Sequence, residues 1–254
     1  MAGAQVHSDL VTTFSPHPAP LAGPRLMRQV WADLTFVHWA VDPDRVAHLL
    51  PRGTVPDELG GATYVGLIPF RMQQAGFGRG PAIPYLGDFA ETNVRLYSVD
   101  GQGRHGVVFR SLETSRLVAA VGARLAFATP YTWARMRIDR RDDVVDYTTR
   151  RRWPGPRGAG GRLTARIGDR ITDPSELDLF LTARFGLHTR WAGQTLWIPN
   201  HHEPWPLRQA DLLHLDDSLV AAAGLPGLVD VAPASVLHAD PVRTVFGLPQ
   251  RVRT

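Results

Sequence analysis

Apolar and polar residues alternate in short segments through most of this chain. A period of two predicts strands that have one apolar and one polar face. The predicted strands cover residues 63–70, 92–99, 106–113, 118–127, 134–138 and 163–167. Because turn residues separate them and few helices intervene, the pattern predicts an α+β fold made mainly of antiparallel strands in a curved or barrel-like sheet. No strand leads through a glycine-rich turn into a helix, which argues against a parallel Rossmann arrangement.

Three short helices are indicated by the residues at their ends. Residues 42–50 start with an Asp-Pro pair, which supplies an N-cap and a first-turn proline, and a second proline follows the segment. Residues 173–186 carry an apolar stripe with helical spacing, and the expected N-cap is Asp173 with Glu176 at the third helical position. A third segment, residues 217–223, ends at a glycine.

The first part of the chain has no regular apolar period. Residues 1–25 are rich in Ala, Pro, His and Ser, which predicts a disordered tail. No linker divides residues 26–254, so a single domain is expected there, with the Gly/Pro-dense residues 153–161 forming a surface loop. The start shows no basic segment followed by an apolar run, and no run of 18 apolar residues occurs. A cytoplasmic protein without membrane contact is therefore expected.

The composition excludes several kinds of chemistry. All 28 basic residues are arginine, so the chain has no lysine and cannot form a lysine Schiff base. It also has no cysteine, which removes disulfides, thiolate nucleophiles and the commonest zinc ligands. The net charge is only +4, and the arginine clusters lie at 140–141 and 150–152. The first cluster is balanced by the two aspartates that follow it, and further arginines at 135, 137, 162 and 166 alternate with apolar residues. No nucleic-acid partner is expected, because a solvated strand face explains these arginines better.

One predicted strand combines charged, amide and aromatic side chains on a single face. The residues on that face are Phe89, Glu91, Asn93, Arg95 and Tyr97. Two interpretations are open: the polar face is solvated, or the sheet closes and this face lines an enclosed cavity. Because aromatic residues bracket the charged ones, as in a mostly enclosed ligand site, the second interpretation is favoured.

The neighbouring predicted strand has a similar mixture. Phe109, Ser111 and Glu113 are expected to share one face, and Arg110 and Leu112 the other. Periodicity alone leaves open which of the two faces turns inward.

Motifs typical of metal, nucleotide or nucleophile sites are missing from the sequence. His201, His202 and Glu203 are adjacent, but neighbouring side chains diverge on an extended chain, so a Pro/Trp-rigidified loop that packs on the core is favoured over a metal site. There is no Gly-x-Ser-x-Gly elbow, no phosphate-binding loop and no dinucleotide fingerprint before a helix. Neither a metal nor a cofactor is expected.

Several motifs, taken in order, resemble the YqjF family, which is also called DUF2071. They are Phe36-x-His38-Trp39, Phe89-x-Glu91-x-Asn93-x-Arg95-x-Tyr97, Phe109-x-Ser111-Leu112, Ala123-Arg124 with Phe127-x-x-Pro130-Tyr131, and His202-x-Pro204-Trp205-Pro206. The resemblance spans residues 28–238. This family is similar to the acetoacetate decarboxylase superfamily, which implies an antiparallel sheet wrapped into a cone-like barrel around a buried site, with Glu91 turned inward.

The resemblance also implies a changed reaction. In the decarboxylases an arginine precedes the Schiff-base lysine; here Arg124 matches that arginine, and Tyr131 stands at the lysine position. Leu125 replaces the glutamate that follows the arginine, and Asp240 stands two positions after His238, where the family commonly has a serine. A phenol cannot form an iminium, so the fold is expected to carry over and the Schiff-base reaction is not.

Three hypotheses follow for the enclosed polar face. In the first, the protein is a cofactor-free lyase or isomerase for a small carbonyl-bearing or oxygenated organic acid, acting by decarboxylation, dehydration or isomerisation. Arg95 or Arg124 would hold a carboxylate or enolate, Glu91 would move protons, and Tyr131 and Asn93 would stabilise oxyanion charge. Further substrate contacts are expected from Tyr97, Ser111 and Glu113. In the second hypothesis the protein binds a small molecule without turnover, and in the third the polar residues pair internally in a structural role. Whether the chain forms a homo-oligomer stays open.

Overall fold

The computed structural model describes residues 14–118 and 129–253. Its strands are β1 (Met27–Ala32), β2 (Leu34–Val41), β3 (Thr54–Pro56), β4 (Thr63–Phe77), β5 (Phe89–Asp100), β6 (His105–Thr114), β7 (Tyr131–Arg141), β8 (Val144–Trp153), β9 (Gly160–Arg170), β10 (Gly186–Trp191), β11 (Gln194–His202), β12 (Leu207–Asp217), β13 (Ser235–Ala239), β14 (Val242–Phe246) and β15 (Gln250–Arg251). The helices are α1 (Pro43–Ala47), α3 (Glu176–Thr182) and α4 (Leu219–Ala222), with a 3-10 turn at Leu228–Asp230. In the described part of the chain, every strand belongs to one sheet.

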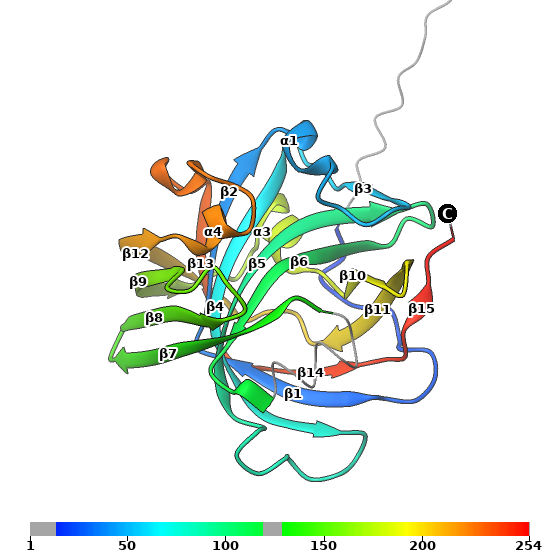
Figure 1. Ribbon diagram of the computed structural model, residues 1–254, viewed down its shortest axis with the longest axis horizontal. Coiled ribbons are helices and arrows are strands. Elements are labelled where there is room, and N and C mark those ends of the chain that lie inside the picture. Colours follow the sequence, from blue (N-terminus) through cyan, green and yellow to red (C-terminus); the bar gives the residue numbers. More distant parts are fainter. Residues whose placement is uncertain (1–13, 119–128, 254) are drawn as a thin grey trace, which may run out of the picture.

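This sheet closes on itself twice. One closed path runs through β1, β4, β5, β6, β10, β11 and β14, and we call it the cavity ring. A second path, the core ring, runs through β4, β5, β6, β7, β8, β9, β12, β13 and β2. Figure 1 shows β7, β8, β9 and β12 on one side of the shared strands and β10, β11, β14 and β1 on the other. Most pairings are antiparallel, which confirms the predicted α+β fold with a barrel-like antiparallel sheet.

The three strands shared by both rings, β4, β5 and β6, are buried on both faces. On β5, Val94 and Leu96 are fully buried and pack in the core ring with Val37 and Val65. Side chains alternate across a strand, so the intervening residues of β5 point into the cavity ring. The sequence left open which face is inside. In the structure both faces are enclosed, and one of them lines the large cavity of the cavity ring.

A β-bulge on β6 changes the expected alternation there. Opposite β5, Val94 pairs with Ser111 and Arg95 pairs with Phe109, which leaves Arg110 as an extra residue. Phe109 and Leu112 consequently share the cavity face, whereas Ser111 and Glu113 turn toward the core ring. The expectation that Phe109, Ser111 and Glu113 share a face is therefore wrong. The Arg110 guanidinium donates hydrogen bonds to the carbonyl oxygens of Leu49 and Ala223, which anchors the bulge.

Most predicted strands are present. Residues 63–70, 92–99, 106–113, 134–138 and 163–167 lie within β4, β5, β6, β7 and β9. The remaining predicted strand, residues 118–127, falls almost wholly outside the described residues. The expected surface loop at residues 153–161 is observed as the connection between β8 and β9.

Helix α3 begins later and ends earlier than predicted. Its N-cap is Ser175 and not Asp173, and the reciprocal partner is Asp178: the Asp178 amide donates to Ser175 Oγ at 3.1 Å, and the Ser175 amide donates to Asp178 Oδ2 at 2.9 Å. The helix ends at Thr182 because the residues from Gly186 onward pair as β10 with β11. Helices α1 and α4 lie within their predicted segments.

Part of the predicted disordered tail is packed against the sheet. Phe14 is 7% exposed, and its ring makes edge contacts with Phe180 at 5.0 Å and His105 at 5.3 Å. Residues 1–13 lie outside the described residues. In the described ranges, no helix has the length and apolar character needed to cross a membrane.

Candidate functional site

A cavity of about 420 Å³ lies inside the cavity ring. Its wall consists mostly of apolar side chains from β1, β4, β5, β6, β11 and β14, with Trp205 beside them. Glu91, Asn93, Arg95 and Tyr131, four residues singled out in the sequence, all line it. The β5 alternation and the parallel pairing of β7 with β6 bring these residues together.

Glu91 is a buried carboxyl group that is 3% exposed. Tyr131 Oη donates a hydrogen bond to Glu91 Oε2 at 3.0 Å. No arginine of the described residues lies within ion-pair distance of this carboxyl, unlike the carboxyls of Asp57 and Glu113. Burial raises the pKa of Glu91 to about 8, although the hydrogen bond from Tyr131 lowers it in part. At neutral pH the Glu91 carboxyl is therefore mainly protonated.

The phenol of Tyr131 is protonated over the same pH range. Burial raises its pKa well above the usual value, and the neighbouring Glu91 carboxyl adds to the shift. Glu91 and Tyr131 thus form a pair of neutral acids at the cavity wall. The Tyr131 proton is donated to Glu91, so the O–H of the protonated Glu91 carboxyl is the donor that this pair offers to a developing oxyanion.

Asn93 presents an unsatisfied polar atom to the cavity. Its side chain is 4% exposed, and Oδ1 has no hydrogen-bond partner within the described part of the chain. Its neighbours across the sheet are Ile68 on β4 and Leu112 on β6, which offer no donor. A buried carbonyl without a donor costs about 1–3 kcal/mol, and a ligand that carries an O–H or N–H group would remove this cost.

Arg95 is a buried cation without a carboxylate partner among the described residues. Its Nε and Nη2 donate to Tyr97 Oη at 3.1 and 2.9 Å, and Nη2 also donates to the Leu181 carbonyl at 2.9 Å. The guanidinium lies 5.3 Å from the centre of the Phe36 ring. Neutral acceptors orient the guanidinium and leave its charge uncompensated, so the site favours an anionic ligand group.

Tyr97 accepts hydrogen bonds from Arg95 and does not itself line the cavity. Its side chain is fully buried, and its Oη lies 2.6 Å from His38 Nε2. Burial lowers the pKa of His38 well below its usual value, and the charges of Arg95 and Arg184 lower it further. His38 is therefore neutral at pH 7. Tyr97 was expected to contact the substrate, but in the structure it contacts Arg95 instead.

Ser111 and Glu113, expected as substrate contacts, lie on the far side of β6. Arg151 binds Glu113 through Nη2 to Oε1 at 2.5 Å and through Nε to Oε2 at 3.1 Å, and Thr132 donates a further hydrogen bond. This carboxyl is fully buried and its charge is matched. Both residues are outside the cavity lining because of the β6 bulge. Arg124 lies outside the described residues.

Two tryptophans of the cavity wall were not predicted from the sequence. The rings of Trp31 and Trp205 stack with centroids 5.7 Å apart, and the Trp205 indole N–H donates to the Thr182 carbonyl at 2.9 Å. His202 lies 4.8 Å from the Trp205 ring, and burial lowers its pKa to about 4. The Pro-flanked Trp205 was a signal of tight packing, but sequence spacing could not place it beside β1.

The described ranges hold no group of three or more His, Asp or Glu side chains arranged to bind a metal ion. The adjacent His201 and His202 are separated by strand alternation, and the ring of His202 is enclosed by aromatic side chains. The packing on the core agrees with the interpretation that the sequence favoured, but His201 and His202 belong to strand β11 and not to a loop.

A buried Ser-His-Asp chain lies near the other end of β5. Ser98 Oγ is 2.8 Å from His188 Nδ1, and His188 Nε2 is 3.2 Å from Asp100 Oδ2. The spacing is that of a nucleophile, a base and an orienting acid. Ser98 is fully buried, however, and burial lowers the pKa of His188 to about 4. Because Ser98 is enclosed in the sheet, the observed role of these hydrogen bonds is to link β5 and β10.

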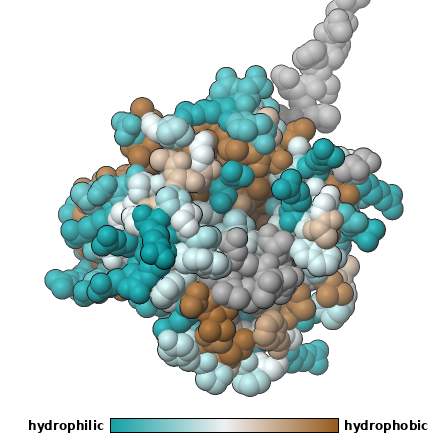
Figure 2. Space-filling model, viewed as in Figure 1, coloured by the Kyte–Doolittle hydropathy of each residue, from teal (hydrophilic) through white to brown (hydrophobic). Residues whose placement is uncertain are grey.

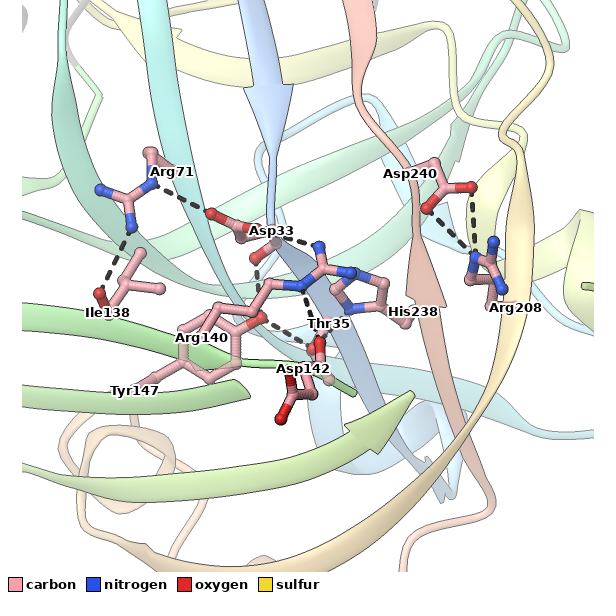
Figure 3. Close-up of polar contacts among 10 residues, drawn as sticks. All are labelled: Asp33, Thr35, Arg71, Ile138, Arg140, Asp142, Tyr147, Arg208, His238 and Asp240. Atoms are coloured by element: carbon pink, nitrogen blue, oxygen red, sulfur yellow. Dashed lines mark hydrogen bonds and ion pairs between the residues drawn. The ribbon is translucent and has the colours of Figure 1, made fainter. Parts of the chain in front are cut away.

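A second polar cluster ties β2, β8 and β13 together outside the cavity (Figure 3). Tyr147 Oη donates to the Asp33 carbonyl at 2.7 Å and lies 2.9 Å from Thr35 Oγ1, which in turn lies 3.2 Å from His238 Nδ1. Nearby, Arg208 Nε donates to both carboxylate oxygens of Asp240 at 3.2 Å. His238 and Asp240 therefore belong to the sheet framework rather than to the cavity wall.

The same fold occurs in several solved structures. An acetoacetate decarboxylase-like enzyme from Sphingomonas wittichii RW1 has a TM-score of 0.62 at 14% identity, over 91% of this chain and 95% of that one. The enduracididine biosynthesis enzyme MppR complexed with pyruvate has a TM-score of 0.62 at 14% identity, over 91% and 92%. Acetoacetate decarboxylase from Legionella pneumophila has a TM-score of 0.58 at 16% identity, over 99% and 98%. The chain therefore has an acetoacetate decarboxylase-like fold.

Sequence similarity gives the family within this fold. Residues 28–243 match the DUF2071 family of uncharacterized conserved proteins, and the chain belongs to that family. The uncharacterized protein YqjF of Bacillus subtilis (strain 168) is 30% identical to it over 186 residues, which cover 73% of this chain and 76% of YqjF. The resemblance drawn from the ordered motifs is thus confirmed.

Proposed function

We propose that this protein is an enzyme that acts on an organic acid with a carbonyl or other oxygen substituent, by acid–base and electrostatic catalysis and without a covalent amine intermediate. The observation that carries the proposal is Glu91, a buried carboxyl in the cavity wall with no cationic partner among the described residues. An unpaired buried carboxyl is costly to maintain, and such groups are concentrated at functional sites.

The protonation of Glu91 suits proton transfer at neutral pH. A carboxyl whose pKa is about 8 can give a proton to a substrate oxygen or to an enolate carbon, and can recover a proton in the next step. Tyr131 donates to Glu91 Oε2 and would stabilise the carboxylate while it is ionised. Decarboxylation, dehydration and isomerisation all require this kind of transfer.

Arg95 and Asn93 would bind the substrate's polar groups. The guanidinium of Arg95 supplies an uncompensated positive charge for a carboxylate, and Asn93 Oδ1 would accept a hydrogen bond from a hydroxyl or enol. Both side chains lie on the strand that carries Glu91, so a rigid element fixes their spacing.

The fold relatives and the composition support the same kind of reaction. MppR was solved with pyruvate, a small keto acid, and the other structures similar in fold to this chain include an acetoacetate decarboxylase. This chain has no lysine, and an iminium intermediate needs a side-chain amine. The proposed reaction therefore depends on Glu91 and Tyr131 for proton transfer and charge stabilisation.

The test is consumption of a metabolite. We would incubate the purified protein with a metabolite extract, follow each component by mass spectrometry, and repeat the assay with Glu91→Gln and Arg95→Met. We expect the wild type to consume a component and Glu91→Gln to lose at least about 100-fold in rate, the usual effect of removing a general acid or base. Arg95→Met should also lower the rate, because the substrate carboxylate loses its cationic partner. The exposed residues Glu58 and Arg166 provide matched controls as Glu58→Gln and Arg166→Met, which should keep full rate.

Two outcomes would reject the proposal. Unchanged turnover in Glu91→Gln, with a thermal unfolding curve like that of the wild type, would remove Glu91 from the chemistry. Retention of a component without its consumption would favour a small-molecule binding protein, the alternative that the mostly apolar, enclosed wall also supports.

A further inference from the structure

The polar groups of the cavity are spread along β5 rather than gathered at one point. Glu91 and Arg95 are four residues apart on a regular strand, so their Cα atoms are separated by about 13 Å at a rise of about 3.3 Å per residue. The Arg95 guanidinium is bound to Tyr97 and Leu181, and Tyr97 lies farther along the strand from Glu91. A molecule of three or four carbons cannot contact both groups at once.

The cavity continues past Glu91 as an apolar channel. Phe89 is the next cavity-facing residue of β5, and it pairs with Met72 on β4. Phe77, Ile83 and Leu86 extend the wall beyond them. Phe77 is 59% exposed, which places an open end there. Figure 2 shows apolar surface at the same end of the molecule, over the connection between β4 and β5.

We propose that the ligand of this site is an amphipathic carboxylic acid with an extended apolar body. Its carboxylate binds Arg95, its chain passes Asn93 and Glu91, and its apolar end lies against Phe77 and Leu86. This inference rests on the proposed function for the reacting group, but the ligand class follows from the cavity alone. A volume of about 420 Å³ falls within the range of about 300–1,000 Å³ of sites that enclose drug-sized ligands.

The distance between Arg95 and Glu91 also limits the reactions that the site can catalyse. A carboxylate held at Arg95 is several bonds away from the atom next to Glu91. Arg95 therefore anchors the substrate, and proton transfer at Glu91 acts on an oxygen-bearing carbon in the middle of the chain. Dehydration or isomerisation at that carbon fits this arrangement, whereas loss of the anchored carboxylate as carbon dioxide does not.

Binding of a chain-length series tests the ligand class without any turnover. We would titrate the protein with butyrate, hexanoate, octanoate and decanoate by calorimetry, below their micelle concentrations. Each methylene group buried in the channel should tighten binding about fourfold, so decanoate should bind at least 100-fold more tightly than butyrate. Arg95→Met should weaken decanoate binding and leave the binding of decanamide unchanged, because only the acid uses the positive charge.

Two surface variants test the position of the apolar end. Phe77 lines the cavity and Val55 does not, yet both side chains are 59% exposed, so both tolerate an aspartate without loss of a packed core. Phe77→Asp should weaken decanoate about tenfold or more and leave butyrate unchanged, and Val55→Asp should change neither. Equal affinities for butyrate and decanoate, or equal effects of the two variants, would overturn the inference.

The proposed enzyme activity and the proposed ligand class can be rejected independently of each other. Chain-length-dependent binding without turnover of any component would reject the enzyme and keep the ligand class. Turnover of a short acid, with no gain in affinity along the series, would keep the enzyme and reject the amphipathic ligand.

Discussion

Glu91 and Tyr131 illustrate how enclosure by apolar side chains sets the protonation state of a single residue. The Glu91 carboxyl accepts a hydrogen bond from a phenol, which lowers its pKa, but the loss of water raises the pKa more. A paired carboxyl in the same molecule behaves differently: the Glu113 charge is matched by Arg151. The contrast distinguishes a reactive carboxyl from a structural one in the same sheet.

Removal of the Tyr131 hydroxyl should raise the pKa of Glu91 further. In Tyr131→Phe the hydrogen bond that favours the carboxylate is lost, so the protonated form should persist to higher pH than in the wild type. Infrared spectroscopy can follow the carbonyl stretch of the protonated carboxyl, which Glu91→Gln identifies by its disappearance. The exposed Tyr85 supplies the control Tyr85→Phe. A lower titration midpoint in Tyr131→Phe would contradict the expectation.

Disruption of the Glu113–Arg151 pair should destabilise the fold strongly. Glu113→Ala leaves the Arg151 guanidinium, which is 5% exposed, without its partner, and we expect a loss of about 3–5 kcal/mol. The double variant Glu113→Leu/Arg151→Met should cost less than Glu113→Ala, because no charge is left buried. Urea denaturation measures both. The control is the exposed Asp143: the free energy of unfolding of Asp143→Ala should stay within about 0.5 kcal/mol of the wild-type value. If Asp143→Ala lost as much stability as Glu113→Ala, burial of the ion pair would not be the cause.

Alternation along one strand was enough to predict which residues of β5 share a face. Glu91, Asn93 and Arg95 do line one cavity, as the period of two required. Tyr97 shares their face but supports Arg95, because the arginine side chain covers it. The sequence could not show that Arg95 lacks an acidic partner among the described residues, since ion pairing depends on elements far away in the chain.

At the scale of secondary-structure elements, the β6 bulge is the feature that could not be predicted from the sequence. Ser111 and Glu113 were expected beside Phe109, and the extra residue Arg110 places them on the other face. The position of a bulge depends on how the strand pairs with its partner, and this register cannot be predicted from a single sequence. The acceptors that hold the bulge also lie far away in the chain: the Arg110 guanidinium donates to the carbonyl oxygens of Leu49 and Ala223.

The start of α3 gives a test at the same scale. Ser175→Ala removes the side chain that accepts from the Asp178 amide, and we expect a loss of about 1 kcal/mol in the free energy of unfolding. Asp173, the N-cap expected from the sequence, lies outside the observed helix, so Asp173→Ala should have little effect. Denaturation midpoints of the two variants decide between the caps: a larger loss for Asp173→Ala would restore the cap predicted from the sequence.

At the scale of the whole molecule, the two closed rings explain how one sheet holds both a core and a cavity. The sequence predicted the strand-rich, barrel-like class correctly, because alternation and turn residues are local signals. It could not predict which strands close each ring, because closure uses pairings such as β1 with β4 and β6 with β10 between distant segments. Strands β10 and β11 were missed as well, although they complete the cavity ring.

The stability of the whole protein should be greatest near pH 7. Burial lowers the pKa of four histidines, three of them to about 4: His38, His188, His202 and His238. Their unfolded pKa is about 6.5, so the unfolded state binds more protons as the pH falls from 6.5 toward 4, and stability is lost there. Glu91 and Asp217, whose pKa values burial raises to about 8 and about 6, act in the opposite direction.

The net effect can be measured by urea denaturation at pH 5, 7 and 9. Between pH 7 and 5 the four histidines gain protons on unfolding and outnumber the two carboxyls that oppose them, so a net loss of stability is expected. Above pH 7 the Glu91 carboxyl continues to ionise in its buried site, so a further decrease in stability is expected by pH 9. His214 is exposed, and His214→Gln should leave the profile unchanged. Equal midpoints at pH 5 and pH 7 would show that the buried histidines do not control acid stability.

The extra residue at Arg110 also bears on how a cavity of this kind changes during evolution. Phe109 and Ser111 pair with the adjacent β5 residues Arg95 and Val94, so Arg110 is the one residue that β6 has in excess. Deletion of Arg110 would join Phe109 to Ser111 in regular alternation and would leave Ser111, Leu112 and Glu113 on their present faces. A single-codon deletion at this point would therefore shorten the strand without changing the cavity wall, and relatives with a gap there should be aligned so that Ser111 keeps its partner Val94.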